Sequence, residues 1–292
     1  MKIGLFGRNV SDEGIQYLQL LIDKLKQAEC NLLVYEPFLK QIRNKVTLAG
    51  EAQPFDTHSE LCNNCDLLFS IGGDGTMLDT ISLVRNSGIP VLGINLGRLG
   101  FLSSISRNEI LPAIDEVIAG NYQLEQRTLI MLDQPKGLFG EINYALNELS
   151  LSKTDNTSLA VIEVFVDNKF LNTYWADGLL VATPTGSTAY SLSCYGPIIS
   201  PDSENFVITP IASHNLTVRP IVVRDSSVIT LKLSGRNKQY LAGLDSRYQT
   251  INNTEELVVK RADFRLNLIQ LPNKDFFTTL REKLLWGKDQ RN

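Results

Sequence analysis

The sequence has little of several residue types on which whole classes of protein depend. It contains only 2 histidines and 4 cysteines among 292 residues. A histidine-rich metal site is therefore excluded, and a Ser-His-Asp triad is possible only through His58 or His214. There is no run of about 18 apolar residues, which a membrane-spanning helix would need. The start of the chain also lacks a basic segment followed by an apolar one, so we expect no secretory signal and a cytoplasmic location.

The cysteines fit a reducing compartment better than a disulfide scaffold. Cys62 and Cys65 form a C-x-x-C pair. A structural zinc site would need two further ligands, and no second pair follows. We therefore expect ordinary thiols and assign no metal ligand.

An excess of positive charge is also missing. The chain has 28 Lys and Arg against 32 Asp and Glu, a formal net charge of −4. This balance gives no general attraction to nucleic acid or to an anionic membrane, and we expect neither as a partner. Any anionic ligand must instead be bound locally, by backbone N–H groups, a helix N-terminus, a metal ion or a few basic side chains.

The length favours two domains, and the 43% of apolar residues supply their cores. Short apolar runs at 2–6, 31–35, 67–71 and 89–94 predict strands, while the spacing over 11–29 and 75–85 predicts helices. This alternation is typical of an α/β domain with a parallel sheet, which we place at residues 1–122 and end with a helix at 107–118.

The remainder of the chain changes to a β-rich character. We expect strands at 126–132, 142–152, 160–166, 227–233, 239–244, 256–261 and 265–270. The stretch 175–197 mixes Gly, Ser, Thr and Pro, so it cannot form one regular element over its whole length. Residues 123–272 are therefore predicted to form a β-rich, sandwich-like domain. A final helix at 275–286, in a segment 273–292, is expected to pack back on the first domain.

The sharpest local motif is Gly72-Gly73-Asp74-Gly75-Thr76, which lies between a predicted strand and a predicted helix. Glycines leave backbone N–H groups bare, so such a turn at a helix N-terminus is suited to binding phosphates. It matches neither a Walker A loop nor a G-x-G-x-x-G fingerprint. The alternative is a tight turn in which Asp74 only caps the helix.

A second motif runs from Thr183 to Tyr190 with the sequence TPTGSTAY. It gathers small hydroxyl residues and an aromatic ring ahead of a predicted short helix. Such a stretch is often only a turn, and it lacks the G-x-S-x-G order of a hydrolase.

These two motifs, together with Asn147-Glu148 and Asp177-Gly178, occur in the order and approximate spacing of the NAD kinases. The chain resembles a bacterial member of that family over nearly its whole length. GGDGT alone is shared with diacylglycerol kinases, sphingosine kinases and phosphofructokinases, whereas TPTGSTAY is highly specific. The alternatives are a lipid or sugar kinase of the same superfamily and a non-catalytic NAD-binding module.

The resemblance implies transfer of a phosphoryl group from ATP, or from polyphosphate, to the 2′-hydroxyl of the adenosine ribose of NAD, giving NADP. It makes Asp74 the proton acceptor. It also implies a divalent ion, Mg²⁺ by preference, and assembly as a homodimer or homotetramer. The donor phosphates would meet Gly72, Gly73, Gly75 and Thr76.

The resemblance also implies the residues that bind NAD. Asn147 and Glu148 would hold ribose hydroxyls, and Asp177 would meet the nicotinamide end. The remaining candidates are Asp74, Gly75, Thr188, Ala189, Tyr190, Ser191, Leu192, Ser193, Ala212 and Arg247.

The chain departs from the family pattern at three places. Tyr195 stands where a glycine is common, Trp175 where some relatives have a basic residue, and Arg247 where glutamine is usual. Arg247 would then meet a phosphate instead of making an amide contact.

Overall fold

The protein is described here from a computed structural model that covers residues 1–292, apart from 49–51, 98, 156–157, 273 and 286–292. Two compact units divide the chain. The first comprises Met1–Gln126 together with the residues from Leu266 onward, and the second comprises Arg127–Arg265. The strands β7 (Gln123–Gln134) and β18 (Glu256–Gln270) each contribute residues to both units.

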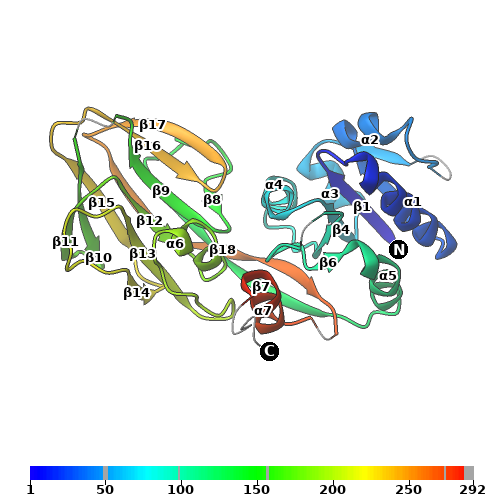
Figure 1. The fold of residues 1–292 in the computed structure, drawn as a ribbon. Helices are drawn as coiled ribbons and strands as arrows, with labels where there is room; N and C mark the ends of the chain where they lie inside the picture. The colour runs from blue at the N-terminus through cyan, green and yellow to red at the C-terminus, as the bar shows by residue number, and fades with distance from the viewer. Residues whose placement is uncertain (49–51, 98, 156–157, 273, 286–292) are drawn as a thin grey trace. The chain divides into compact units, whose positions relative to one another are not determined.

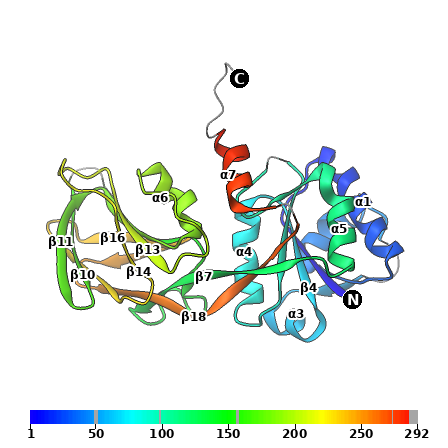
Figure 2. The ribbon, with the colours of Figure 1, turned by 90° about the horizontal axis from the view of Figure 1, so that it is seen from below.

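The first unit contains a parallel sheet with the strand order β18-β5-β4-β1-β2-β3, and β6 pairs with β5. In Figure 2, α4 lies on one face of this sheet and α1 with α5 on the other. The elements are β1 (Lys2–Gly7), α1 (Asp12–Gln27), β2 (Asn31–Tyr35), α2 (Glu36–Ile42), β3 (Gln53–Phe55), α3 (His58–Asn64), β4 (Leu67–Ile71), α4 (Asp74–Val84), β5 (Val91–Asn95), β6 (Ile105–Ser106), η1 (Arg107–Glu109), α5 (Ile110–Ile118) and α7 (Phe276–Leu284).

The sequence explains why these elements form. Ser11 caps α1 by accepting the Gly14 N–H, and the helix buries Leu18, Leu21, Ile22 and Leu25 on one face. All five residues of β4 are buried, as expected for a central parallel strand. The buried residues of α1 and β4 belong to the same apolar core, which holds the carboxyl end of β4 in place.

The second unit is built almost entirely from antiparallel strands (Figure 1). One sheet has the order β14-β13-β12-β9-β16-β17, and the other runs β11-β10-β15-β18, with β7 pairing with β18 and β8. Its further elements are β8 (Tyr144–Ala145), β9 (Glu148–Lys153), β10 (Ala160–Val166), β11 (Lys169–Ala176), β12 (Gly178–Ala182), η2 (Thr185–Thr188), α6 (Tyr190–Ser193), β13 (Asn205–Ile211), β14 (Ile221–Arg224), β15 (Ile229–Ser234), β16 (Gln239–Leu244) and β17 (Arg247–Asn252).

Residues from both sheets share a large apolar core in this unit, so it is a β-sandwich. The predicted fold class, an α/β domain followed by a β-rich one, is confirmed. Two strand predictions need correction. The predicted strand 142–152 is interrupted at Leu146 and Asn147, whose N–H groups bind the Asp245 side chain instead of a neighbouring strand. The strands predicted at 256–261 and 265–270 are one continuous strand, β18.

The C-terminal helix α7 belongs to the first unit, as expected. Asp275 caps it by accepting the Thr278 N–H, Leu280 is buried, and the Lys283 ammonium donates to the carbonyl of Leu99. The helix ends at Leu284, and Trp286, where the sequence placed its end, lies outside the described residues.

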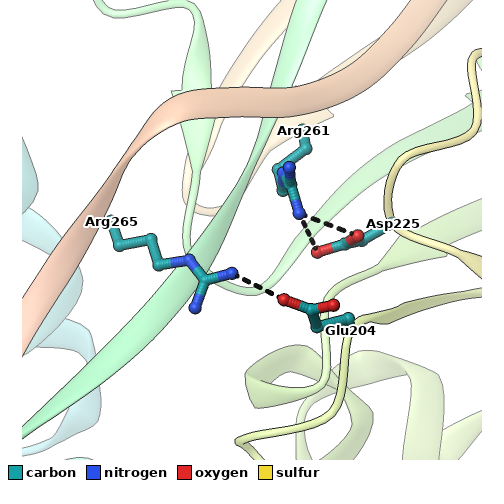
Figure 3. A network of polar contacts seen from close by, with 4 residues as sticks. All are labelled: Glu204, Asp225, Arg261 and Arg265. Carbon is teal, nitrogen blue, oxygen red and sulfur yellow. Dashed lines mark hydrogen bonds and ion pairs between the residues drawn. The ribbon is translucent and has the colours of Figure 1, made fainter.

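Two ion pairs fix β18 within the second unit (Figure 3). The Arg261 guanidinium reaches both carboxylate oxygens of Asp225 at 3.0 Å, and Arg265 reaches Glu204 at 3.0 Å. The Asp225 side chain is only 2% exposed, whereas that of Glu204 is 69% exposed. The Arg261–Asp225 pair should therefore contribute more to stability than the Arg265–Glu204 pair, because a buried charge that loses its partner is costly.

Replacement of Arg261 by alanine leaves the buried Asp225 carboxylate without the guanidinium, and should therefore lower the free energy of unfolding by about 3 kcal/mol. The matched replacement Arg265→Ala, whose partner Glu204 is exposed, should cost less than about 1 kcal/mol, as is usual for an exposed pair. Urea unfolding of both variants measures the difference. Equal losses in the two variants would show that burial of Asp225 is not what matters.

Candidate active site

The glycine-rich motif forms the connection between β4 and α4. Gly72 has φ +152°, and a Cβ built there would lie 2.4 Å from the Thr76 Oγ1. Only glycine fits such a turn. Gly73 is the N-cap of α4 and Asp74 its first residue. The alternative in which Asp74 caps the helix is therefore wrong.

The Asp74 carboxylate is bound by the backbone of a neighbouring loop. Its Oδ2 accepts the N–H of Phe101 at 2.9 Å, and its Oδ1 accepts those of Leu102 and Ser103, both at 3.0 Å. Each carboxylate oxygen has two lone pairs, so Oδ2 can still accept one more hydrogen bond. Asp74 is half-buried, which leaves that acceptor within reach of a ligand.

Two glycines allow this loop to approach, and the sequence analysis missed both. A Cβ on Gly100 would lie 1.9 Å from Asp74 Oδ1, and a Cβ on Gly93 would lie 2.5 Å from the Leu102 carbonyl oxygen. Gly100 follows the run Gly97-Arg98-Leu99, a glycine spacing that was visible but that carried no interpretation without the contact to Asp74.

In the second unit, the Asp245 carboxylate organises the Asn147-Glu148 pair. Asp245 accepts the N–H groups of Leu146, Asn147 and Glu148 at 2.8, 2.8 and 3.2 Å. The next turn packs tightly on the same segment, since a Cβ on Gly186 would lie 2.1 Å from the Asn147 carbonyl oxygen. Asn147 and Glu148 are thus fixed through their backbone, from two sides.

Glu148 lies in an environment that disfavours its charge. Glu148 is 9% exposed, and its Oε2 has no hydrogen-bond partner within the described structure. The carboxyl group does accept a hydrogen bond from the Tyr190 N–H. Burial, reinforced by the nearby Asp245, raises the pKa of Glu148 to about 8. Burial also raises the pKa of Asp245, and the three N–H groups oppose that rise.

Some side chains of residues 188–193 point into the core and others line a cavity. The Ser191 hydroxyl is buried and lies 3.0 Å from that of Thr209, and Thr188 donates to the Thr185 carbonyl at 3.1 Å. Tyr190 is 45% exposed and lines a cavity of about 690 Å³ together with Ser193 and, from the loop after β13, Ala212. The structure therefore brings these three predicted residues to one cavity but turns Ser191 away from it. Ala189 and Leu192 are half-buried, and neither lines the cavity.

Asp177 forms an ion pair with Lys153, at the end of β9. The Lys153 ammonium lies 2.6 Å from Asp177 Oδ1, and its side chain is only 13% exposed. Lys153 was not among the predicted residues, because nothing in the sequence links the end of β9 with Asp177, which lies between β11 and β12. Trp175 is more than half exposed, so it is free of the core.

The departures from the family pattern are explained in part. The Arg247 guanidinium donates to the carbonyls of Ile142 and Tyr144, so a contact with a ligand phosphate would have to replace those bonds. Tyr195 is in the left-handed region at φ +64°, a conformation that glycine adopts at less cost, and its side chain is 92% exposed.

The described residues contain no cluster of three or more His, Cys, Asp or Glu side chains placed to bind a metal. All four cysteines are free thiols, and burial raises the pKa of Cys65 to about 12. In that same part of the chain, no helix is long and apolar enough to cross a membrane.

Comparison with known proteins identifies the class and then the family. The fold is that of kinases that act on dinucleotides: it is similar to yeast NADH kinase solved with NADH, at a TM-score of 0.87 and 26% identity, over 99% of this chain and 89% of that one. A fold likeness at 22% identity extends to an Archaeoglobus fulgidus NAD kinase solved with ATP, at a TM-score of 0.73, over 98% of this chain and 99% of that one.

The sequence comparisons are more specific. The family models of the ATP-NAD kinase N-terminal and C-terminal domains match residues 3–122 and 146–271. The NAD kinase of Cytophaga hutchinsonii is 44% identical over 293 residues and that of Bacteroides fragilis 39% over 291, with 100% of both chains covered in each case. The chain belongs to the ATP-NAD kinase family.

The raised pKa of Glu148 has a consequence for stability. The folded chain keeps the proton up to about pH 8, whereas the unfolded chain releases it near the ordinary value of 4.5. The folded state therefore binds more protons between these values, and its stability should fall as the pH rises, by at most about 1.4 kcal/mol per pH unit.

Glu148→Gln removes the titrating group and with it this part of the pH dependence. The free energy of unfolding of the variant should therefore rise relative to that of the wild type from pH 5 to pH 8. Urea unfolding at unit intervals of pH measures the gain. Glu282→Gln, at an exposed position on α7, should keep the wild-type slope. A constant difference between Glu148→Gln and the wild type would contradict a proton held by Glu148.

Proposed function

We propose that this chain transfers the γ-phosphoryl group of ATP to the 2′-hydroxyl of the adenosine ribose of NAD, producing NADP and ADP. The observation that carries the proposal is the setting of Asp74. A carboxylate with one acceptor position left stands at the start of a helix, directly after a glycine turn. Family membership over the whole chain supplies the identity of donor and acceptor.

Asp74 acts as the proton acceptor. The 2′-hydroxyl donates a hydrogen bond to Oδ2, its oxygen forms a bond to the γ-phosphorus, and the bond from that phosphorus to ADP breaks. The hydroxyl proton passes to Asp74. A loose phosphoryl-transfer transition state requires mainly orientation, so a carboxylate fixed in place by three N–H groups can orient the hydroxyl and finally accept its proton.

The donor phosphates are bound by the turn before α4. The Gly72 N–H donates to the Ile94 carbonyl and the Thr76 N–H to that of Gly73, so these two shape the turn. The proposed phosphate contacts are the N–H groups of Gly73 and Gly75 and the Thr76 hydroxyl, at a helix N-terminus where anions are favoured. Gly75 has open space around it, since nothing lies within 4 Å of a Cβ built there.

We also propose a divalent ion, Mg²⁺ by preference, which offsets the phosphate charge. Mg²⁺ usually keeps several waters and binds through substrate phosphates and one or two carboxylates. Because the acceptor position left on Asp74 Oδ2 is assigned to the 2′-hydroxyl, the ion would be held chiefly by the substrate phosphates and by water.

NAD is bound by the second unit in this proposal. The Asn147 amide and the Glu148 carboxyl hold ribose hydroxyls, and a protonated Glu148 donates one of these hydrogen bonds. Tyr190, Ser193 and Ala212 line the cavity proposed for a base. Asp177, held by Lys153, meets the nicotinamide end. The roles of Thr188, Ala189, Ser191, Leu192 and Arg247 stay predictions, as do assembly into a homodimer or homotetramer, use of polyphosphate and a cytoplasmic location.

A screen of acceptors tests the proposal. The purified chain is given γ-labelled ATP with NAD, NADH, diacylglycerol or fructose 6-phosphate, and labelled products are separated. We expect label on the dinucleotide and none on the lipid or sugar. Label on diacylglycerol or fructose 6-phosphate alone would favour the other kinases, and nucleotide binding without transfer would favour a non-catalytic module.

Gly100 should be as important for turnover as a residue that touches substrate. Because its Cβ would overlap Asp74 Oδ1, Gly100→Ala must displace the carboxylate. We expect kcat to fall by about 100-fold, the lower end of the contribution of a general base, with little change in the KM for NAD.

Gly97→Ala is the matched control, because its Cβ would meet only Asn95 Oδ1, at an ordinary 3.6 Å. It should keep kcat within about twofold of the wild type. A Gly100→Ala enzyme with normal kcat would show that the position of Asp74 is not critical.

A further inference from the structure

Lys153 and Asp177 are joined twice, once through their side chains and once through the backbone. The Lys153 ammonium lies 2.6 Å from Asp177 Oδ1, and the Lys153 N–H donates to the Asp177 carbonyl at 3.0 Å. The Asp177 N–H in turn donates to the carbonyl of Ile211 at 2.9 Å. Asp177 is therefore fixed from two neighbouring strands, β9 and β13, and the Lys153 side chain begins directly beside its carboxylate.

The burial of the pair decides how its charges act. The Lys153 side chain is only 13% exposed, whereas that of Asp177 is 44% exposed. An ion pair on the open surface is weakened by water and salt, but a partly buried pair is screened much less. The exposed side of the Asp177 carboxylate can meet a ligand. Such a ligand then faces an ion pair and not an isolated negative charge.

The pair acts on the cavity that Tyr190 and Ala212 line. Ala212 directly follows Ile211, which accepts the Asp177 N–H. The pKa of Tyr190 is raised chiefly by burial, and the charge of Asp177 is among the further causes. Electrostatic effects of this kind fall off with distance, so a charge at Asp177 is felt inside the cavity.

The two redox states of the dinucleotide differ by one charge. The nicotinamide ring carries a positive charge in NAD and none in NADH. A carboxylate without a partner beside this ring would favour NAD, because opposite charges attract. A carboxylate paired with an ammonium would favour neither form strongly. The preference at this end of the substrate therefore depends on the net charge of the pair, which is neutral with Lys153 and negative without it.

We propose that Lys153 sets the preference of the chain between NAD and NADH. It acts through Asp177, whose charge it cancels at the nicotinamide end, and so lowers the advantage of NAD over NADH. Lys153 is thus a specificity-determining residue that needs no contact with the substrate. The inference rests on the proposed function, because the proposed function assigns Asp177 to the nicotinamide end.

Removal of the ammonium tests the proposal. Lys153→Met keeps most of the apolar stem but loses the charge, so NAD should bind more tightly while NADH binds as to the wild type. Calorimetry on the full chain in low salt gives the dissociation constants for NAD and for NADH. We expect the preference for NAD over NADH to rise by about three- to tenfold.

Three further variants separate charge from structure. Lys153→Arg keeps the positive charge and should keep the wild-type ratio of the two affinities. Asp177→Asn leaves the ammonium without its partner, so its ratio should shift toward NADH. Lys232→Met is the matched control, because it breaks an exposed pair with Glu256 on β15, outside the cavity. It should leave both affinities unchanged.

An unchanged ratio in Lys153→Met would overturn the proposal. An equal loss of both affinities in that variant would also overturn it, since Lys153 would then be a purely structural residue. The same holds if Lys153→Arg behaves like Lys153→Met, because the charge would not be what matters.

The binding assay needs no turnover, so the two proposals fail separately. A wild-type chain that binds both dinucleotides but transfers no phosphoryl group would refute the proposed function alone. Normal NADP formation together with an unchanged ratio in Lys153→Met would refute the role of Lys153 alone. A chain that binds neither dinucleotide would refute both.

Discussion

Both units depend on one interaction, an aspartate carboxylate that accepts three consecutive backbone N–H groups. Asp74 accepts those of residues 101–103, and Asp245 accepts those of residues 146–148. Such bonds to an ionised acceptor are among the stronger hydrogen bonds in proteins, and each set fixes a loop that no helix or strand would otherwise hold. Each candidate site is therefore built around a segment of backbone tied to one carboxylate.

The two aspartates have different parts in the proposal. Asp245 lies beside Glu148, where it positions Asn147 and Glu148 and disfavours the charge on Glu148. Asp74 is half-buried and keeps an acceptor position. One carboxylate thus organises a binding surface, and the other is left to react.

The sequence predicted the regular elements better than the contacts of the site. The strand at 31–35 and the position of α4 followed from periodicity, because their apolar residues alternate with clear turn signals. Several shorter elements were missed, because three to eight residues give little period to read. They are α2, β3 and α3 in the first unit and β11, β12, β13, β14 and β17 in the second. The fold class followed from the long elements and was not affected.

Motifs located Asp74, Asn147 and Glu148, but their supports could not be predicted. Gly100 lies 26 residues from Asp74, and Asp245 lies 97 residues from Glu148. Pairings of that kind appear only when the chain is folded. The net charge of −4 is consistent with local binding of anions, in which backbone N–H groups at fixed places bind the ligand and no general positive field is needed.

The central claim is that Asp74 accepts the proton in phosphoryl transfer, and turnover by Asp74→Asn tests it most directly. Asparagine keeps the shape of the side chain and one acceptor oxygen but cannot take the proton. The account expects ATP-dependent formation of NADP to fall by about 100-fold or more, while calorimetric binding of NAD is retained. The urea midpoint should fall slightly, because the asparagine NH2 cannot accept the Phe101 N–H that Oδ2 accepts. A variant that makes NADP at near-normal rates would contradict the account.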